Sequence, residues 1–147
     1  MQFDIRDASD TSTKAPRRYT MVVNAGGRSS LRVGARVPYA TGSSQPAAQS
    51  SGVAPLVSTQ YSYADIGVNI DCTLLEAGTK VKLNAELELS GTMKRDEPGI
   101  PYAPTIASTR ISIGATLAMN KPVQVASVED PVTSRRFDVE AGVTRIP

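Results

Sequence analysis

The sequence contains no histidine and only one cysteine, which excludes most common catalytic and metal-binding arrangements. Histidine is the usual general base, a member of the Ser-His-Asp triad and the commonest metal ligand. A structural zinc site draws four ligands mainly from cysteine and histidine, and this chain cannot supply them. Asp4, Asp7 and Asp10 lack the glycine and terminal glutamate of a calcium-binding loop, so we interpret them as solvated. We therefore expect no enzyme activity, no cofactor and no metal ion.

Tryptophan is absent and aromatic residues make up only 5% of the chain. Because hydrophobic residues make up 40% of the 147, the core must rest mainly on Val, Leu, Ile and Ala, and we expect support from neighbouring subunits. With one cysteine, Cys72, no intramolecular disulfide forms. Cys72 is in phase with Val68, Ile70 and Leu74, so we interpret it as a small buried apolar residue. A reactive thiol or an intermolecular disulfide is the alternative.

The chain has no apolar run near the roughly 20 residues that a membrane helix needs. Its first residues, Met1–Asp7, lack the basic start and apolar stretch of a signal peptide. We expect either a cytoplasmic protein or a mature form whose export signal is missing from this sequence. The net charge is +2 with both signs interspersed, so we expect no nucleic-acid partner. The basic pairs at residues 17–18 and 135–136 are interpreted as flanking strand ends.

Strict alternation of apolar and polar residues is the strongest pattern that is present. Between Lys80 and Leu89 every second residue is apolar, which predicts a strand buried on one face. The segment from Val68 to Leu74 repeats this pattern, and Gly78 between the two segments can adopt a positive φ. Together they predict a β-hairpin.

Further strands are predicted along the chain in the same way. A short one includes Phe3 and Ile5, and longer ones cover residues 18–23, 29–39, 110–119, 123–128 and 136–146. Val123–Val128 is predicted to pair with the strand before it, through a turn at residues 120–122. The fold class is thus all-β: an antiparallel sheet, sandwich or open barrel of about seven or eight strands.

Two long loops and one polar segment interrupt these strands. Thr41–Pro55 is rich in Ser, Gln, Ala, Gly and Pro, and Met93–Pro104 contains three prolines and a charge run. Residues 1–17 form a polar N-terminal segment in which Asp4–Ala15 is expected to be a loose linker. Residues 18–147 then form one β-domain.

Three short motifs follow one another within this domain. The first comprises Gly34, Val37, Pro38 and Tyr39; the second Tyr63, Asp65, Gly67 and Val68; the third Pro104, Ile106 and Arg110. Over about residues 18 to 130 this order resembles the C-terminal part of the secretin domain. Secretins form the outer-membrane channels of bacterial type II and type III secretion and of type IV pili.

The resemblance implies a secretin-like, non-enzymatic structural or assembly domain of the bacterial cell envelope, in the periplasm or outer membrane, or secreted. Such a domain would self-associate into a ring, barrel or fibre, with further copies or other envelope proteins as partners. It would associate with a membrane only through assembly. Thr41–Pro55 would be gate-like, and Met93–Pro104 membrane-proximal or peripheral.

Elementary physics adds two expectations and one alternative function. Pro38 lacks a backbone donor and belongs at a strand end or edge, and Gly67 permits a bend or bulge. The alternative is a monomeric exported β-sandwich that binds a small ligand or a polysaccharide through its loops. Its candidate aromatic residues are Tyr61, Tyr63 and Tyr102, although packing of Tyr61 and Tyr63 within the sheet is favoured.

Overall fold

The computed structural model describes residues 1–9, 15–44, 58–93, 105–131 and 133–146. In this part of the chain there are eight strands and no helix: β1 (Gln2–Asp7), β2 (Arg17–Thr20), β3 (Arg28–Ser44), β4 (Ser58–Ala77), β5 (Lys80–Met93), β6 (Thr105–Ala118), β7 (Val123–Glu129) and β8 (Arg136–Gly142). The all-β prediction is confirmed. Since the described residues contain no helix, none of them forms a helical membrane span.

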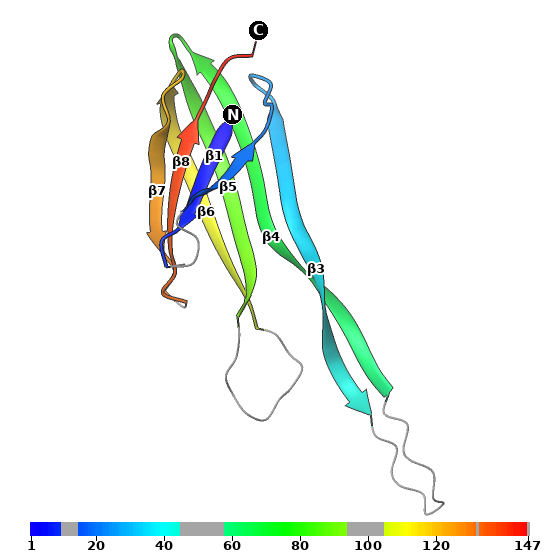
Figure 1. Cartoon of the computed structure of the whole chain (residues 1–147). Helices are drawn as coiled ribbons and strands as arrows, with labels where there is room; N and C mark the ends of the chain where they lie inside the picture. Colours follow the sequence, from blue (N-terminus) through cyan, green and yellow to red (C-terminus); the bar gives the residue numbers. More distant parts are fainter. Residues whose placement is uncertain (10–14, 45–57, 94–104, 132, 147) are drawn as a thin grey trace, which may run out of the picture.

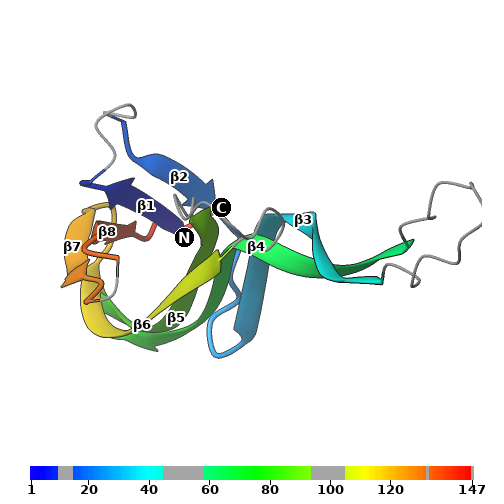
Figure 2. The same ribbon diagram turned by 90° about the horizontal axis from the view of Figure 1, so that it is seen from below.

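The strands form two antiparallel sheets of four, in the orders β2-β1-β8-β7 and β3-β4-β5-β6. The sheets face each other and curve around one core, as an open barrel that does not close (Figures 1 and 2). Strands of the first sheet have 4 to 7 residues, whereas those of the second have 14 to 20. The second sheet therefore extends well beyond the first at one end.

The core lies between the sheets and follows the alternation of the sequence. The buried side chains of β4 and β5 are those predicted: Val68, Ile70, Cys72, Leu74, Val81, Leu83, Ala85, Leu87 and Leu89. Ile111, Ile113 and Leu117 of β6 and Phe137, Val139 and Ala141 of β8 are buried with them. The turn predicted at Gly78 forms, with a φ of 65°, and Gly26 adopts a φ of 79° in the turn before β3.

The N-terminal segment belongs to the body of the domain. β1 lies between β2 and β8, with Phe3 opposite Tyr19 on one side and Ala141 on the other. The short strand predicted at Phe3 and Ile5 is confirmed, but the linker predicted from Asp4 onward is wrong for Asp4–Asp7. Asp4 lies on the outer side of β1, between the buried Phe3 and Ile5. Its carboxylate accepts a hydrogen bond from Arg18 Nε at 2.9 Å, so its charge is compatible with a strand.

β7 does not pair with β6, which corrects a second expectation. The predicted turn forms at Asn120 (φ 59°), but β7 then joins the other sheet and pairs with β8. The backbone N–H of Asn120 donates to the carbonyl of Val143 at 2.8 Å and helps to hold this crossing in place. Alternation shows that a segment is a strand, but it does not identify the strand beside it.

The first long loop begins later than expected. Thr41–Ser44 still belong to β3, and Gly42–Ser44 pair with residues 58–60 of β4 after an irregularity between Ala40 and Gly42. Backbone hydrogen bonding extends the hairpin here although the side chains are small and polar. Residues 45–55 of the first predicted loop and 94–104 of the second lie outside the described residues.

Candidate functional site: the arm and the mouth

β3 and β4 leave the second sheet together at a row formed by Gly34, Gly67 and Ser90. The pairing of β4 with β5 ends at Gly67 and Ser90, whereas β3 and β4 remain paired as far as Ser44 and Ser58. Beyond this row, within the described residues, β3 is the only strand paired with β4. We call residues 35–44 and 58–66 the arm. Figure 1 shows it projecting away from the body of the domain.

Two glycines allow the strands to approach at the root of the arm. Gly67 has a φ of 145°, which side chains rarely permit, and a Cβ on it would lie 2.2 Å from the Val33 carbonyl oxygen. A Cβ on Gly34 would lie 2.2 Å from the Ile66 carbonyl oxygen. The Ser90 hydroxyl accepts a hydrogen bond from the Gly67 N–H at 3.0 Å. This side chain thus binds the backbone at the point where the β4–β5 ladder ends.

The two faces of the arm have different chemistry. Residues directly opposite on paired strands point to the same side, so one face carries Ala35 with Ile66 and Val37 with Ala64. This aliphatic face (Ala35, Val37, Ala64 and Ile66) continues the side of β4 that is buried in the body. The other side carries the aromatic face (Pro38, Tyr61 and Tyr63), on which each tyrosine is 62% exposed, together with Arg36 and Asp65. Tyr39 lies on the aliphatic side, opposite Ser62.

The first two sequence motifs come together on this hairpin. Gly34 lies opposite Gly67 and Pro38 opposite Tyr63, whereas Val37 and Tyr39 lie opposite residues 64 and 62. Pro38 lies on β3, the edge strand of its sheet, as its missing backbone donor predicts.

The remaining motif positions are Asp65 on the arm, Val68 in the body of β4, two residues of β6, and one residue outside the described part of the chain. Asp65 accepts a hydrogen bond from Arg36 Nε at 3.0 Å, and Val68 is buried at the edge of the core. In the third motif, Ile106 lies on β6 opposite Thr92. Arg110 contacts Glu86 and Glu88 at 3.5 and 3.6 Å on the outer face of the body. Pro104 and the candidate Tyr102 lie outside the described residues.

A small cavity opens between the sheets beside the root of the arm, and we call this opening the mouth. Its volume is about 100 Å³, and apolar side chains from both sheets line it, among them Val68, Leu89 and Phe137. Asp7, Thr109 and Arg135 contribute polar groups to the lining. Neither tyrosine of the aromatic face reaches it.

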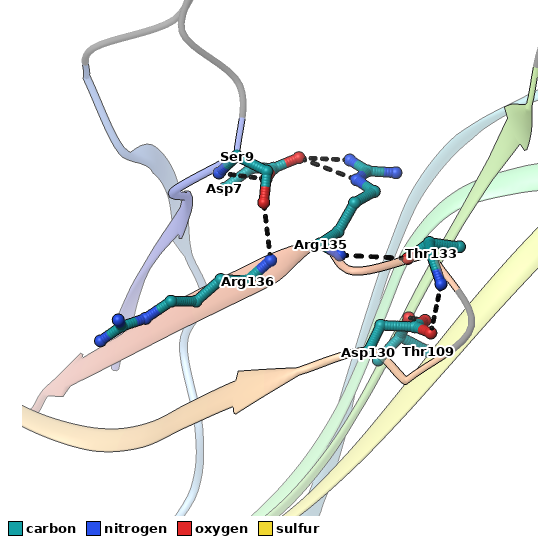
Figure 3. Close-up of polar contacts among 7 residues, drawn as sticks. All are labelled: Asp7, Ser9, Thr109, Asp130, Thr133, Arg135 and Arg136. Carbon is teal, nitrogen blue, oxygen red and sulfur yellow. Dashed lines mark hydrogen bonds and ion pairs between the residues drawn. The ribbon is translucent and has the colours of Figure 1, made fainter.

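Polar contacts join the strand ends around the mouth (Figure 3). The carboxylate of Asp7 accepts a hydrogen bond from Arg135 Nε at 3.0 Å, and the Arg135 guanidinium lies 5.1 Å from the ring centre of Phe137. The hydroxyl of Thr109 donates to Asp130 at 2.6 Å, which links β6 to the turn between β7 and β8. Because these groups bind one another, we interpret them as holding the two sheets together.

Sequence reasoning missed this network because its members are far apart in the chain. Asp7 and Arg135 are separated by 128 positions. The one available signal was the basic pair at residues 135–136, which was correctly interpreted as flanking a strand end, since β8 begins at Arg136. Among the described residues, no group of three or more Asp, Glu or Cys side chains is placed to hold a metal ion.

Cys72 is buried in the core, as predicted. Its Sγ lies 3.7 Å from Sδ of Met21, and only 2% of the residue is exposed. Burial raises the pKa of the thiol and thereby disfavours the reactive thiolate. The structure therefore supports a packing role for this residue.

Four carboxylates on the outer faces of the sheets are held in their charged form. Hydrogen bonds lower the pKa of each, from Arg18 to Asp4, from Ser30 to Asp71, from Asn69 and Ser108 to Glu88, and from Ser127 to Asp138. Because the pKa is lower in the folded state than in the unfolded state, each of these groups stabilises the fold only while it is ionised.

Acid is therefore expected to destabilise the domain. The four carboxylates contribute fully to the free energy of unfolding above their ordinary pKa values, 4.5 for Glu and 3.8 for Asp. This contribution is lost as the pH falls through the lowered pKa values of the folded state. Since the chain has no histidine, the free energy of unfolding should change little between about pH 6 and 8. Urea titrations from pH 8 to 2 measure this profile, and Glu88→Gln should make the acid limb shallower. Unchanged stability at pH 3 would contradict the prediction.

No protein-family model, curated protein or solved structure matches this chain. The function is therefore argued from the arm and from the motifs that form it.

Proposed function

We propose that this chain is a non-enzymatic structural or assembly domain of the bacterial cell envelope. In this proposal it self-associates into a ring, barrel or fibre, with an architecture resembling part of a secretin. The observation that carries the proposal is the arm. Beyond Gly67, the edge of β4 that faces β5 in the body is paired with no other strand among the described residues, and β3 forms the outer edge of the same sheet.

Exposed strand edges favour the addition of strands from a neighbouring chain. A hairpin of two strands is only marginally stable by itself in water, whereas three or more strands with a buried face are stable. The arm extends nine residues of β4 beyond the point where β5 leaves it. A second copy is therefore the proposed partner, and a head-to-tail contact that repeats gives a ring or a fibre.

The envelope location rests on the resemblance to secretins. The two motifs that carry most of this resemblance are those that pair across the root and length of the arm, from Gly34 to Tyr39 and from Tyr63 to Val68. If the arm mediates assembly, most residues of these two motifs lie in or beside the segment that contacts the neighbouring copy.

The mouth itself is too small to be the site of the ligand-binding alternative. Its cavity of about 100 Å³ is smaller than an engineered cavity of about 150 Å³ that holds benzene. A sugar ring would not fit in it. Of the tyrosines that the alternative needs, Tyr61 and Tyr63 lie on the arm and do not line this cavity, and Tyr102 lies outside the described residues.

The proposal is tested by measuring oligomeric size with and without the arm. In the shortened variant, Asn-Gly replaces residues 37–64 and joins Arg36 to Asp65, which lie opposite each other in the hairpin. We expect light scattering to show concentration-dependent oligomers of the full chain and a folded monomer of the variant. Circular dichroism and cooperative unfolding check that the variant folds. A full chain that stays monomeric at its highest soluble concentration contradicts the proposal.

A further inference from the structure

We propose that two copies of this chain join along the open edge of β4, the edge that β5 leaves at Gly67. The two β4 strands run antiparallel and are related by a two-fold axis at Ser62. This inference rests on the proposed self-association and specifies its first contact. Three observations carry it: the direction of the backbone groups on β4, the protection of the other edge of the arm, and the symmetry of β4 about Ser62.

Every second residue of β4 in the arm directs its backbone N–H and C=O toward the open edge. At Gly67 these groups point toward β5, since the Ser90 hydroxyl accepts from the N–H at 3.0 Å and donates to the carbonyl at 3.4 Å. The Gln60 carbonyl points the other way, because it accepts a hydrogen bond from the Thr41 hydroxyl of β3 at 3.3 Å. Since this direction alternates along a strand, the residues that face the open edge are 59, 61, 63 and 65.

The other edge of the arm, on β3, is protected against an added strand. Pro38 lies opposite Tyr63, and two opposite residues direct their backbone groups either both toward each other or both away. Pro38 therefore places its nitrogen, which has no hydrogen to donate, at the outer edge of β3. The irregularity between Ala40 and Gly42 lies on the same strand. Prolines and bulges are devices that prevent edge pairing.

The open edge of β4 lacks this protection. Residues 58–66 contain no proline, and their single charge, on Asp65, is paired with Arg36 at 3.0 Å. The arm projects from the body, and no strand among the described residues pairs with this edge (Figure 1). Such an edge is a template for another strand.

A second copy fits this edge because β4 is symmetric about Ser62. Residue 62 is the centre of the segment 58–66, so an antiparallel copy in this register pairs over the full length of the arm. The edge-facing residues are also symmetric about it, so their donors meet acceptors of the other copy. Tyr61 then lies directly opposite Tyr63 of the second copy, and aromatic pairs in this position stabilise antiparallel strands. An unrelated strand would satisfy the backbone groups but would not supply these tyrosines by symmetry.

A two-fold contact closes on itself and gives a dimer, in which the arms form one sheet of four strands in the order β3-β4-β4-β3. Growth into a ring or fibre then uses the outer edges of β3, which the dimer leaves exposed. Because Pro38 and the irregularity weaken pairing there, dimers should form at lower concentration than larger assemblies.

Single cysteines on β4 test the register. Ser62 faces its own copy in a non-hydrogen-bonded pair, where side chains lie closest, so Ser62→Cys should form a disulfide-linked dimer under mild oxidation. Ala64→Cys is the matched control, because the two copies of residue 64 lie about 13 Å apart along the strands. It should crosslink only when mixed with Gln60→Cys, which it faces. Cys72 is buried, so the unmodified chain should not crosslink.

A proline at the open edge tests the hydrogen bonding. Tyr61→Pro removes an edge-facing donor that the pairing with β3 does not use, and it does so once in each copy. Relative to Tyr61→Ala, which also lacks the ring, we expect dimerisation to weaken about thirtyfold, or about fivefold for each lost hydrogen bond. Light scattering over a dilution series measures this difference.

The outcomes separate this contact from self-association in general. If the unmodified chain self-associates but Ser62→Cys crosslinks no more than Ala64→Cys, or if Tyr61→Pro dimerises as well as Tyr61→Ala, the two-fold contact is overturned while self-association stands. An unmodified chain that stays monomeric at its highest soluble concentration overturns self-association and this contact with it.

Discussion

Replacement of Phe3 by alanine should lower the free energy of unfolding by about 3 to 5 kcal/mol, the usual range for a buried phenylalanine. Phe3 is 0% exposed and lies on β1, which is hydrogen-bonded on both sides. It is one of only two phenylalanines in a chain with no tryptophan. Because the surrounding Val, Leu and Ala side chains are short, they cannot fill the space that the ring leaves.

Urea unfolding followed by circular dichroism measures this effect. Phe3→Leu is the control, since it keeps most of the apolar volume and should cost less than about 1.5 kcal/mol. Ile106→Ala is a second control, because Ile106 is 38% exposed on β6 and contributes little to the core. A loss below about 1 kcal/mol for Phe3→Ala would mean that β1 is not packed as a central strand.

The buried side of β4, β5 and β6 could be predicted because each strand repeats its apolar pattern over four or more residue pairs. β1 offers only Phe3 and Ile5, set among charged residues, so the pattern was too short to outweigh the polar composition around it. Strand partners could not be predicted in the same way. The choice of β8 over β6 as the neighbour of β7 depends on how the two sheets close over the core.

The arm shows a further limit of sequence reasoning. The alternation of β4 runs without interruption from Ala64 through Ile66 to Val68, yet only Val68 is buried. Whether these β4 side chains are buried depends on the other sheet, whose strands cover Val68 but end before the arm begins. The sequence did predict that Tyr61 and Tyr63 share a face, and it marked Gly67 as a place for a bend. It could not show that the hairpin leaves the body there.

Gly67→Ala is the second substitution with a large expected effect. A residue held in a sparsely populated backbone region costs about 1 to 3 kcal/mol, and Gly67 has a φ of 145°. The new Cβ would also lie 2.2 Å from the Val33 carbonyl oxygen and 2.5 Å from the Gly34 Cα, so the strands must separate. We expect the loss of stability to reach the top of that range. Gly114→Ala on β6 is the control, because its Cβ would meet only Asn84 Oδ1 at 3.8 Å.

The stability losses caused by substituting Gly34 and Gly67 should not be additive. Non-additivity would show that the two substitutions disturb the same close approach of β3 and β4, not two separate sites. Gly34→Ala alone places a Cβ 2.2 Å from the Ile66 carbonyl oxygen and forces the same pair of strands apart. Once one substitution has separated the strands, the second meets less obstruction, so the double variant should lose less stability than the sum of the singles. Urea unfolding of the three variants completes the cycle. Strict additivity would show that each substitution strains only its own strand, and that the close approach of Gly34 and Gly67 does not hold β3 and β4 together at the root of the arm.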